Sequence, residues 1–237
     1  MAWLFVLGVG VFAGAISGII GTRSSMILLP VLAIVFGPKV AVPIMAVSAF
    51  IANAGRVVVW WSEVRWRAVL WFSLLAVPGA VLGAKTLIAI PDAVGNYLLG
   101  GLLLLLIPLR YWIRGSKIGS KPIHLLWAGG FIGFFTGIVA SSGPLSLAAF
   151  SSFGLAKAGL IATEAAASFF VFGAKATTFR QLGALETETL IHGMLVGGSV
   201  VAGTFVAKRL LNKISADHHD RIIDITLLVA GLAIILS

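Results

Sequence analysis

The sequence predicts an all-α polytopic membrane protein built from two inverted repeats. Of its 237 residues, 59% are hydrophobic and only 11% are charged, and the mean hydropathy is +1.09. A soluble domain could not cover so much apolar surface, whereas a bilayer accepts runs of about 20 apolar residues as spanning helices. Residues 12–56 and 131–175 can also be laid over each other without a gap, which indicates a duplicated unit.

The residues that coincide in this overlay are small, aromatic, hydroxylated or cationic. Among the pairs are Gly14 with Gly133, Gly18 with Gly137, Thr22 with Ser141, Phe50 with Phe169 and Arg56 with Lys175. Internal repeats recur in secondary transporters, whose binding sites lie at the junction between the copies. A cation at the same position in each copy therefore indicates a carrier of anions.

Each repeat is expected to contain about five helical segments, of which the first two form a broken or re-entrant hairpin. The segments of the first repeat are 3–20, 25–36, 40–61, 67–90 and 94–113, and those of the second are 123–140, 144–155, 158–178, 188–211 and 219–237. The second segment of each set is too short to cross about 30 Å of hydrocarbon at about 1.5 Å per residue. It is either half of a broken hairpin or a very short, kinked span. Pro30, Pro38 and Pro43, within or just beyond this segment of the first repeat, agree with a break.

A basic linker separates the two repeats and sets the expected orientation. The first repeat is residues 1–113, the linker is 114–122 and the second repeat is 123–237. Placing the linker in the cytoplasm puts twelve of the 17 Lys and Arg residues near that side, in agreement with the positive-inside rule. The two repeats then begin on opposite faces of the membrane, so they are inverted. We expect a multi-pass protein of the inner cell membrane with both termini outside.

Composition excludes several other classes of protein and site. The net charge of +9 sits in short loops between apolar runs, so it sets topology and forms no nucleic-acid surface. The chain has no cysteine, which excludes disulfides and thiolate metal sites. His218 and His219 are adjacent and cannot face one way on a helix, so no metal site is expected there. We expect no cofactor, and the expected partners are the lipid bilayer, a small anion and protons as a candidate coupling ion.

The turn that follows the first segment of each repeat is the expected anion site. The residues concerned are Gly21, Thr22, Arg23, Ser24 and Ser25 in the first repeat, and Ser141, Ser142 and Gly143 in the second. Ser or Gly can cap the helix that follows, and Pro144 suits a first helical turn. A helix start exposes unpaired N–H groups and the positive end of the helix dipole, which together bind small anions. The alternative is a pair of tight turns between packed helices, where Gly and Ser are common.

These turns also carry a resemblance to a known family. Gly18-x-x-Gly21, a small-residue turn and then Pro30 resemble the glycine-rich signature of the TauE/SafE family of sulfite exporters. Ser141-Ser142-Gly143-Pro144 resembles the corresponding turn of that family. The chain departs from the family pattern at Thr22, Arg23 and Ser24, where glycines are usual. The resemblance implies a polytopic inner-membrane permease that moves small sulfur-containing anions such as sulfite or organosulfonates.

Four further polar residues are predicted to lie within the membrane. Arg56 and Lys175 come late in the third segment of each repeat, so each either attracts an anion at one mouth or snorkels to the interface. Asn53 lies one turn before Arg56 and either contacts the substrate or joins helices. Glu164 either couples protons to transport or neutralises a cation such as Arg23 or Lys175, and we favour the second interpretation.

Three functions are compatible with these features. A secondary transporter for a small anion is favoured, without an ATPase of its own because no Walker-type Gly-Lys-Ser/Thr occurs. An intramembrane hydrolase would pair a buried serine such as Ser142 with His192, but a single histidine in another segment is weak support. A membrane scaffold or assembly factor would not need broken hairpins. We therefore expect a transporter and not an enzyme.

Overall fold

The computed structural model of the chain describes residues 8, 10–11, 24–91, 94, 97, 100–102, 104–105, 107–109, 111, 121–139, 143–210, 228 and 232. Within them the regular elements are α2 (Ser24–Phe36), α3 (Pro38–Val59), η1 (Trp61–Glu63), α4 (Trp66–Ala89), α6 (Pro122–Val139), α7 (Gly143–Ser152), α8 (Lys157–Gln181) and α9 (Thr187–Leu210). The predicted all-α class is confirmed, and the α-helices begin and end close to the predicted limits. The segments predicted at 3–20, 94–113 and 219–237 lie largely outside the described residues.

Helix length separates the membrane-spanning helices from the short ones. α3, α4, α6 and α8 each contain a stretch that is long and apolar enough to cross a membrane. α2 has 13 residues and α7 has 10. At about 1.5 Å per residue they are about 20 Å and 15 Å long, which is less than the hydrocarbon core of about 30 Å. The second segments are as short as predicted, and their re-entry into the membrane stays a prediction.

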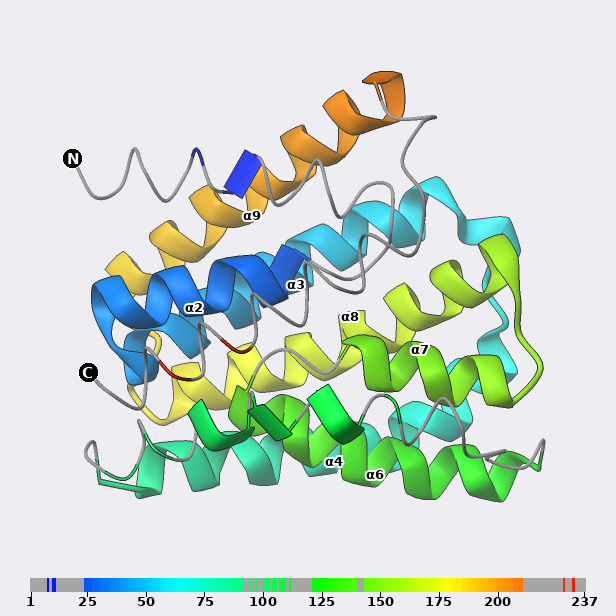
Figure 1. The fold of residues 1–237 in the computed structure, drawn as a ribbon, viewed down its shortest axis with the longest axis horizontal. Helices are drawn as coiled ribbons and strands as arrows, with labels where there is room; N and C mark the ends of the chain where they lie inside the picture. The colour runs from blue at the N-terminus through cyan, green and yellow to red at the C-terminus, as the bar shows by residue number, and fades with distance from the viewer. Residues whose placement is uncertain are drawn as a thin grey trace.

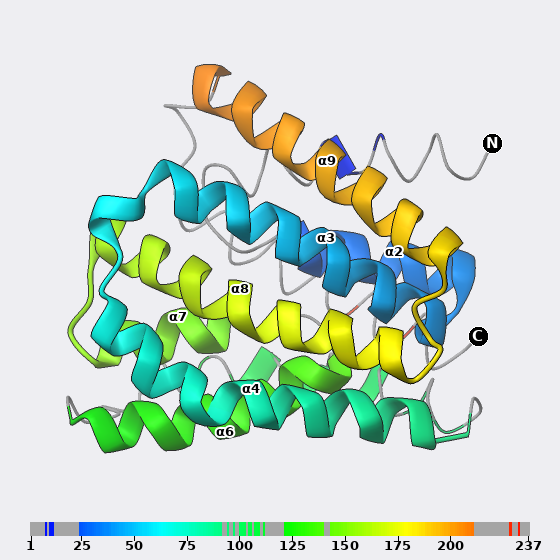
Figure 2. The ribbon, with the colours of Figure 1, turned by 180° about the vertical axis from the view of Figure 1, so that it is seen from behind.

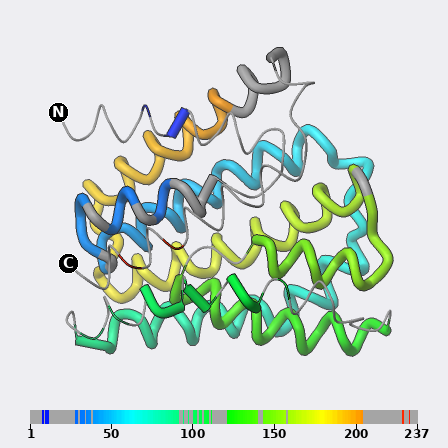
Figure 3. Tube along the Cα trace, in the orientation of Figure 1, coloured from blue at the N-terminus to red at the C-terminus, as the bar shows by residue number. Residues whose placement is uncertain are grey.

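The long helices run along the longest axis of the molecule (Figure 1). α3 and α8 pack against each other, α9 packs against α3, and α4 packs against α8 (Figure 2). The trace of the chain shows that α3 and α8 run in opposite directions (Figure 3). α2 packs on α3, α7 packs on α8, and α6 packs along α4. The antiparallel pair α3 and α8 therefore forms the centre from which the other elements are positioned.

The two short helices each occupy one half of the length of the molecule (Figures 1 and 2). α2 lies in the half where α3 begins, and α7 lies in the opposite half, where α8 begins. Each short helix starts near mid-length and runs outward to the end from which the next long helix returns. Helix starts at this depth are tolerated where protein or a water-filled cavity satisfies the backbone.

The positions of the helix starts agree with the predicted duplication. Ser24 begins α2 and Gly143 begins α7, while Pro38 begins α3 and Lys157 begins α8. Gly143 follows Ser24, and Lys157 follows Pro38, by the same number of positions that separates residue 131 from residue 12 in the sequence overlay. The packing repeats as well, because α9 packs on α3 as α4 packs on α8. Two copies of one unit account for both observations, and the inversion itself stays a prediction.

The backbone turns between α2 and α3 at a glycine followed by a proline. Gly37 has a φ of 78°, a left-handed conformation that glycine adopts without steric cost. Pro38 begins α3, where its missing N–H removes no helical hydrogen bond. Pro30 and Pro43 lie inside α2 and α3 and end neither helix. Of the three prolines expected to mark a break, only Pro38 stands at a helix boundary.

The seam between α4 and α6 consists of small residues that let the two backbones meet. Gly129, Gly133 and Gly137 recur every four residues and form one face of α6. A Cβ atom built on Gly133 would overlap the carbonyl oxygen of Ala76, and one on Gly137 would lie 2.5 Å from the carbonyl oxygen of Ala80. Close backbone approach of this kind lets dispersion forces hold helices together in lipid, where there is no hydrophobic drive.

Candidate functional site

α8 carries three polar side chains on one buried face. Glu164, Ser168 and Lys175 follow one another at spacings of four and then seven residues, which return to nearly the same side of an α-helix. Glu164 and Lys175 are 0% exposed, and Ser168 is also buried. Ionisable side chains at membrane depth are rare and usually functional. This face of α8 is therefore the first candidate for a site.

Lys175 is held at the end of α6, and no carboxylate of the described residues pairs with it. Its Nζ donates a hydrogen bond of 2.6 Å to the carbonyl oxygen of Thr136, and it lies 5.5 Å from the centre of the Phe179 ring. Thr136 belongs to the last turn of α6, which ends at Val139, so its carbonyl lies at the negative end of the helix dipole. Neither the carbonyl nor the ring cancels the positive charge, and an ammonium group has two more N–H donors to offer.

Arg56 lies in the last turn of α3, close to the opposite end of the central helix pair. Its side chain is buried, and it is attracted by the charge of Glu164. The Glu164 carboxylate also has a contact within its own helix: its Oε1 accepts a hydrogen bond of 2.7 Å from Ser168 Oγ. The two cations thus differ in their surroundings: Arg56 has an acid beside it, whereas Lys175 has a carbonyl oxygen.

Among the described residues, Arg56 is the cation that interacts with Glu164. Arg23 lies outside the described residues. Lys175 lies eleven residues further along the same helix, about 16 Å away by helical rise, which is too far for a direct ion pair. The antiparallel crossing of α3 and α8 brings Arg56 to the level of Glu164 instead. Arg56 and Lys175 are both buried within the protein.

An aromatic contact stands between the two cations. Phe50 of α3 and Phe169 of α8 stack with ring centroids 4.6 Å apart and planes inclined at 23°. Arg56 follows Phe50 by six residues, and Lys175 follows Phe169 by six residues, a rise of about 9 Å in each case. Because the helices are antiparallel, the two cations lie on opposite sides of the stacked rings along the length of the molecule.

The expected turns can be placed only in part. Gly21, Thr22, Arg23, Ser141 and Ser142 lie outside the described residues. Ser24 and Ser25 form the first turn of α2, and Gly143 begins α7. Both helix starts lie near mid-length of the molecule (Figure 1). The positive ends of two helix dipoles therefore lie near the middle of the molecule.

Two groups near the cations escaped the sequence analysis. Ser168 could have been found, because a hydroxyl four residues after Glu164 faces the same side of the helix. Thr136 could not, because its carbonyl and not its side chain binds Lys175. Asn53 lies where it was expected, buried one turn before Arg56.

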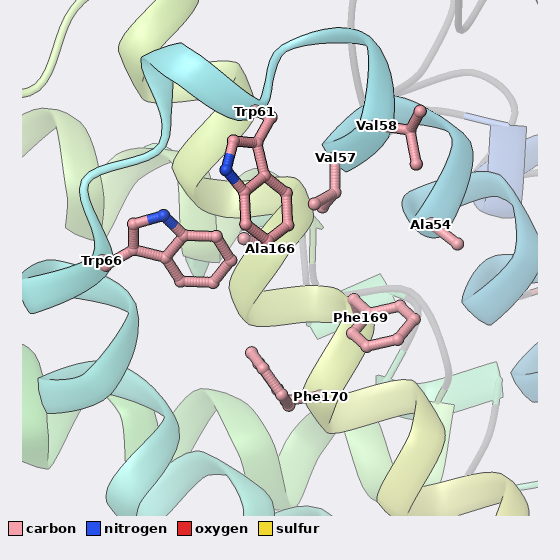
Figure 4. Close-up of a pocket in the computed structure, with 8 residues that line it drawn as sticks. All are labelled: Ala54, Val57, Val58, Trp61, Trp66, Ala166, Phe169 and Phe170. Atoms are coloured by element: carbon pink, nitrogen blue, oxygen red, sulfur yellow. The ribbon is translucent and has the colours of Figure 1, made fainter.

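An apolar groove of about 300 Å³ opens elsewhere on the molecule. Figure 4 shows its lining from the end of α3, η1, the start of α4 and the middle of α8: Ala54, Val57, Val58, Trp61, Trp66, Ala166, Phe169 and Phe170. Trp61 and Trp66 are exposed, and their rings are 4.8 Å apart. Tryptophans at this position are typical of the membrane–water interface. With no polar group in its lining, the groove is unsuited to an anion.

His192 and metal binding receive no support from the described residues. His192 Nε2 lies 4.0 Å from Glu188 Oε1, one turn earlier on α9, which agrees with a role bonded to its own helix. Ser142, its expected hydrolase partner, lies outside the described residues. Within the described part of the chain, no three His, Cys, Asp or Glu residues gather as a metal site would require.

Comparison with known proteins adds one finding. The family model described as "Sulfite exporter TauE/SafE" matches residues 6–234. No curated protein and no solved structure matches the chain significantly. The match extends over nearly all of the chain and confirms the resemblance carried by the two turns.

Proposed function

Because the chain belongs to the TauE/SafE sulfite exporter family, we propose that it is a secondary transporter for sulfite or an organosulfonate. Membership of this family implies a membrane transporter of sulfur-containing anions and not an enzyme. The described residues contain four helices that are both long and apolar enough to span, which agrees with a polytopic membrane protein. The choice among sulfur anions is our own inference and follows from the charged groups and helix starts of the candidate site. Two cations and two helix starts suit a small, compact oxyanion.

The observation that carries the proposal is the placement of Lys175. It is 0% exposed, and its hydrogen bond goes to a carbonyl oxygen. A buried ammonium without a carboxylate is costly to maintain, so its persistence at depth favours a role in attracting a negative substrate. Arg56 is the equivalent cation of the first repeat and would serve the opposite mouth.

The substrate would be bound by groups from both repeats. The first contributes Gly21, Thr22, Arg23, Ser24, Ser25, Asn53 and Arg56, and the second contributes Ser141, Ser142, Gly143 and Lys175. Backbone N–H groups at the starts of α2 and α7 would receive the oxygens of the anion. Glu164 would set the charge at the Arg56 end, as a charge partner or a coupling group.

Transport would follow the alternating access of inverted repeats. Phe50 and Phe169 would separate the two cationic regions, so that the substrate meets Arg56 from one side and Lys175 from the other. The positive-inside rule places the linker, and with it the Arg56 end of α3, on the cytoplasmic side of the inner membrane. Both termini would then be outside.

Flux into proteoliposomes tests the proposal. The purified protein would be offered sulfite, thiosulfate, sulfate, organosulfonates and acetate, each on its own and each in competition with sulfite. We expect uptake of one or more sulfur anions and none of acetate. Lys175→Met should abolish uptake, whereas Lys85→Met, at an exposed lysine on α4, should leave it unchanged. Equal uptake by both variants would show that the Lys175 charge has no part in transport.

A further inference from the structure

Three atoms around Arg56 lack hydrogen-bond partners in the described part of the chain. They are Arg56 Nη1, Asn53 Oδ1 and Glu164 Oε2, and all three lie out of contact with solvent. The three side chains are at most 9% exposed. Buried polar atoms almost always find partners in proteins. A cluster of unpaired ones therefore indicates a place where a further molecule binds.

These atoms belong to one small region. Asn53 and Arg56 are one helical turn apart on α3 and are neighbours on its surface. Glu164 precedes Phe169 by five residues on the antiparallel α8, so the Phe50–Phe169 contact sets it at the level of Arg56. Glu164 Oε1 already accepts a hydrogen bond from Ser168 Oγ, so Oε2 is the carboxylate oxygen available to a ligand.

The hydrogen-bonding character of the cluster restricts the ligand. Arg56 Nη1 is a donor, whereas Asn53 Oδ1 and Glu164 Oε2 are acceptors. A fully deprotonated oxyanion has only acceptor atoms, so it would pair with Arg56 and face two more acceptors without a proton between them. An oxyanion that keeps one O–H presents an anionic oxygen and a donor together. While Glu164 is ionised, only the second kind of anion satisfies Arg56 and Glu164 at once, since a carboxylate accepts hydrogen bonds and donates none.

We propose that Arg56, Asn53 and Glu164 bind the substrate as its singly protonated monoanion. An anionic oxygen accepts a hydrogen bond from Arg56 Nη1, and the O–H of the same anion donates to Glu164 Oε2 or to Asn53 Oδ1. The inference rests on the proposed function, in which the substrate is a small sulfur oxyanion. It adds the protonation state in which that anion is carried, and it makes Glu164 a ligand of the substrate.

Other ionisable groups near Glu164 leave this assignment intact. α3 contributes Arg56, and Lys39 lies at the far end of that helix. Three exposed charged side chains lie where η1 leads into α4: Glu63 ends η1, Arg65 precedes α4 and Arg67 is in its first turn. α7 has no ionisable side chain, and α6 has only His124, which is exposed at its start.

The test compares flux with the concentration of each protonation state. Sulfite uptake by the wild-type protein is measured at a fixed total concentration and at pH values on both sides of the second ionisation of the substrate. We expect the initial rate to follow the concentration of the monoanion, and so to fall as the pH rises. A rate that rises with the dianion would overturn the inference while leaving sulfite transport established. Failure to carry any sulfur anion at any pH would overturn the proposed function itself.

A competition experiment tests Glu164 directly. Methanesulfonate is a monoanion without an O–H, so it should inhibit the wild-type protein weakly. In Glu164→Gln the new amide can donate to an anionic oxygen, and we expect methanesulfonate to inhibit about tenfold more strongly relative to sulfite. Glu63→Gln changes an exposed acid near the same end of the molecule and should behave as the wild type. If methanesulfonate inhibited Glu164→Gln no more strongly, relative to sulfite, than it inhibits the wild type, the inference would be overturned. Should that variant not fold, the pH dependence of sulfite uptake by the wild-type protein tests the inference by itself.

Discussion

Phe50 and Phe169 occupy the same position in the two proposed repeats and stack directly on each other, with ring centroids 4.6 Å apart. Equivalent residues of two copies can touch only where they lie close to the axis that relates the copies. The contact therefore locates the proposed two-fold axis at the centre of the α3–α8 pair. Arg56 and Lys175 lie at equal sequence distances beyond these rings, in opposite directions.

The first prediction concerns this aromatic contact. Stacked rings contribute about 0.5–1.5 kcal/mol beyond their burial, so Phe50→Leu and Phe169→Leu should be coupled in a double-mutant cycle by about 1 kcal/mol. Thermal unfolding of the four proteins in detergent measures the coupling. Phe131 and Phe135, which also lie near each other but on α6 alone, provide a matched cycle within one helix. Strict additivity at Phe50 and Phe169 would show that the rings do not stabilise the crossing.

The second prediction separates charge from stability at Lys175. Methionine retains much of the volume of the lysine stem, and burial of an ammonium is costly, so Lys175→Met should change the free energy of unfolding by no more than about 2 kcal/mol. Binding of sulfite, measured by isothermal titration calorimetry, should nevertheless be lost. Folded protein that binds as the wild type does would assign Lys175 a structural role at the end of α6.

The third prediction concerns Arg56 and Glu164 as a pair. Removing either partner of a buried charge pair leaves the other uncompensated, so Arg56→Met or Glu164→Gln alone should destabilise the protein by about 3 kcal/mol. The double variant should be more stable than either single one, because no buried charge remains. Detergent melting curves give all three values. Arg67→Met, at an exposed arginine, is the control and should have little effect.

Much of the fold was predictable because its signals are local. The α-helices of the described residues begin close to the predicted limits, since runs of apolar residues and the residues that interrupt them determine where a membrane helix can lie. The pairing of Glu164 was not predictable in the same way. Its partner comes from a helix more than a hundred residues earlier in the chain, and only the antiparallel crossing brings the two together.

The residues of the candidate site likewise fall into those with a local sequence signal and those whose contacts only the fold reveals. Arg56, Asn53 and Lys175 were recognised as polar residues within apolar helices, and their burial agrees with this. The bond from Lys175 to Thr136 was missed, because a backbone carbonyl has no sequence signal beyond its place at the end of a helix. The substrate-binding role of the turn residues stays a prediction.

The fourth prediction tests the close packing of α4 against α6. Gly133→Ala adds a Cβ atom that would overlap the Ala76 carbonyl, so the helices must separate and the protein should lose about 1–3 kcal/mol of stability. Gly198→Ala on α9 is the matched control, because a Cβ atom there has no neighbour within 4 Å. That change should be neutral or stabilising by up to about 1 kcal/mol, since alanine favours helix. Equal melting temperatures for the two variants would contradict the close approach of α4 and α6.

The fifth prediction concerns orientation, and the absence of cysteine from the chain makes it simple to measure. Ser62, in η1, and Glu186, between α8 and α9, are both exposed. Ser62→Cys and Glu186→Cys each introduce a single thiol at one of these two sites. The positive-inside rule places Ser62 in the cytoplasm beside Arg65 and Arg67, and it places Glu186 outside.

A membrane-impermeant maleimide added to intact cells should therefore label Glu186→Cys and spare Ser62→Cys until the inner membrane is opened. The structure requires opposite sides, because α3 ends at one end of the molecule and α8 at the other (Figure 2). Labelling of both from the same side would contradict the antiparallel placement of these two helices in the membrane. Labelling of Ser62→Cys alone would agree with the fold but show that its orientation in the membrane is the reverse of the predicted one. Lys175 would then face the cytoplasm and Arg56 the outside.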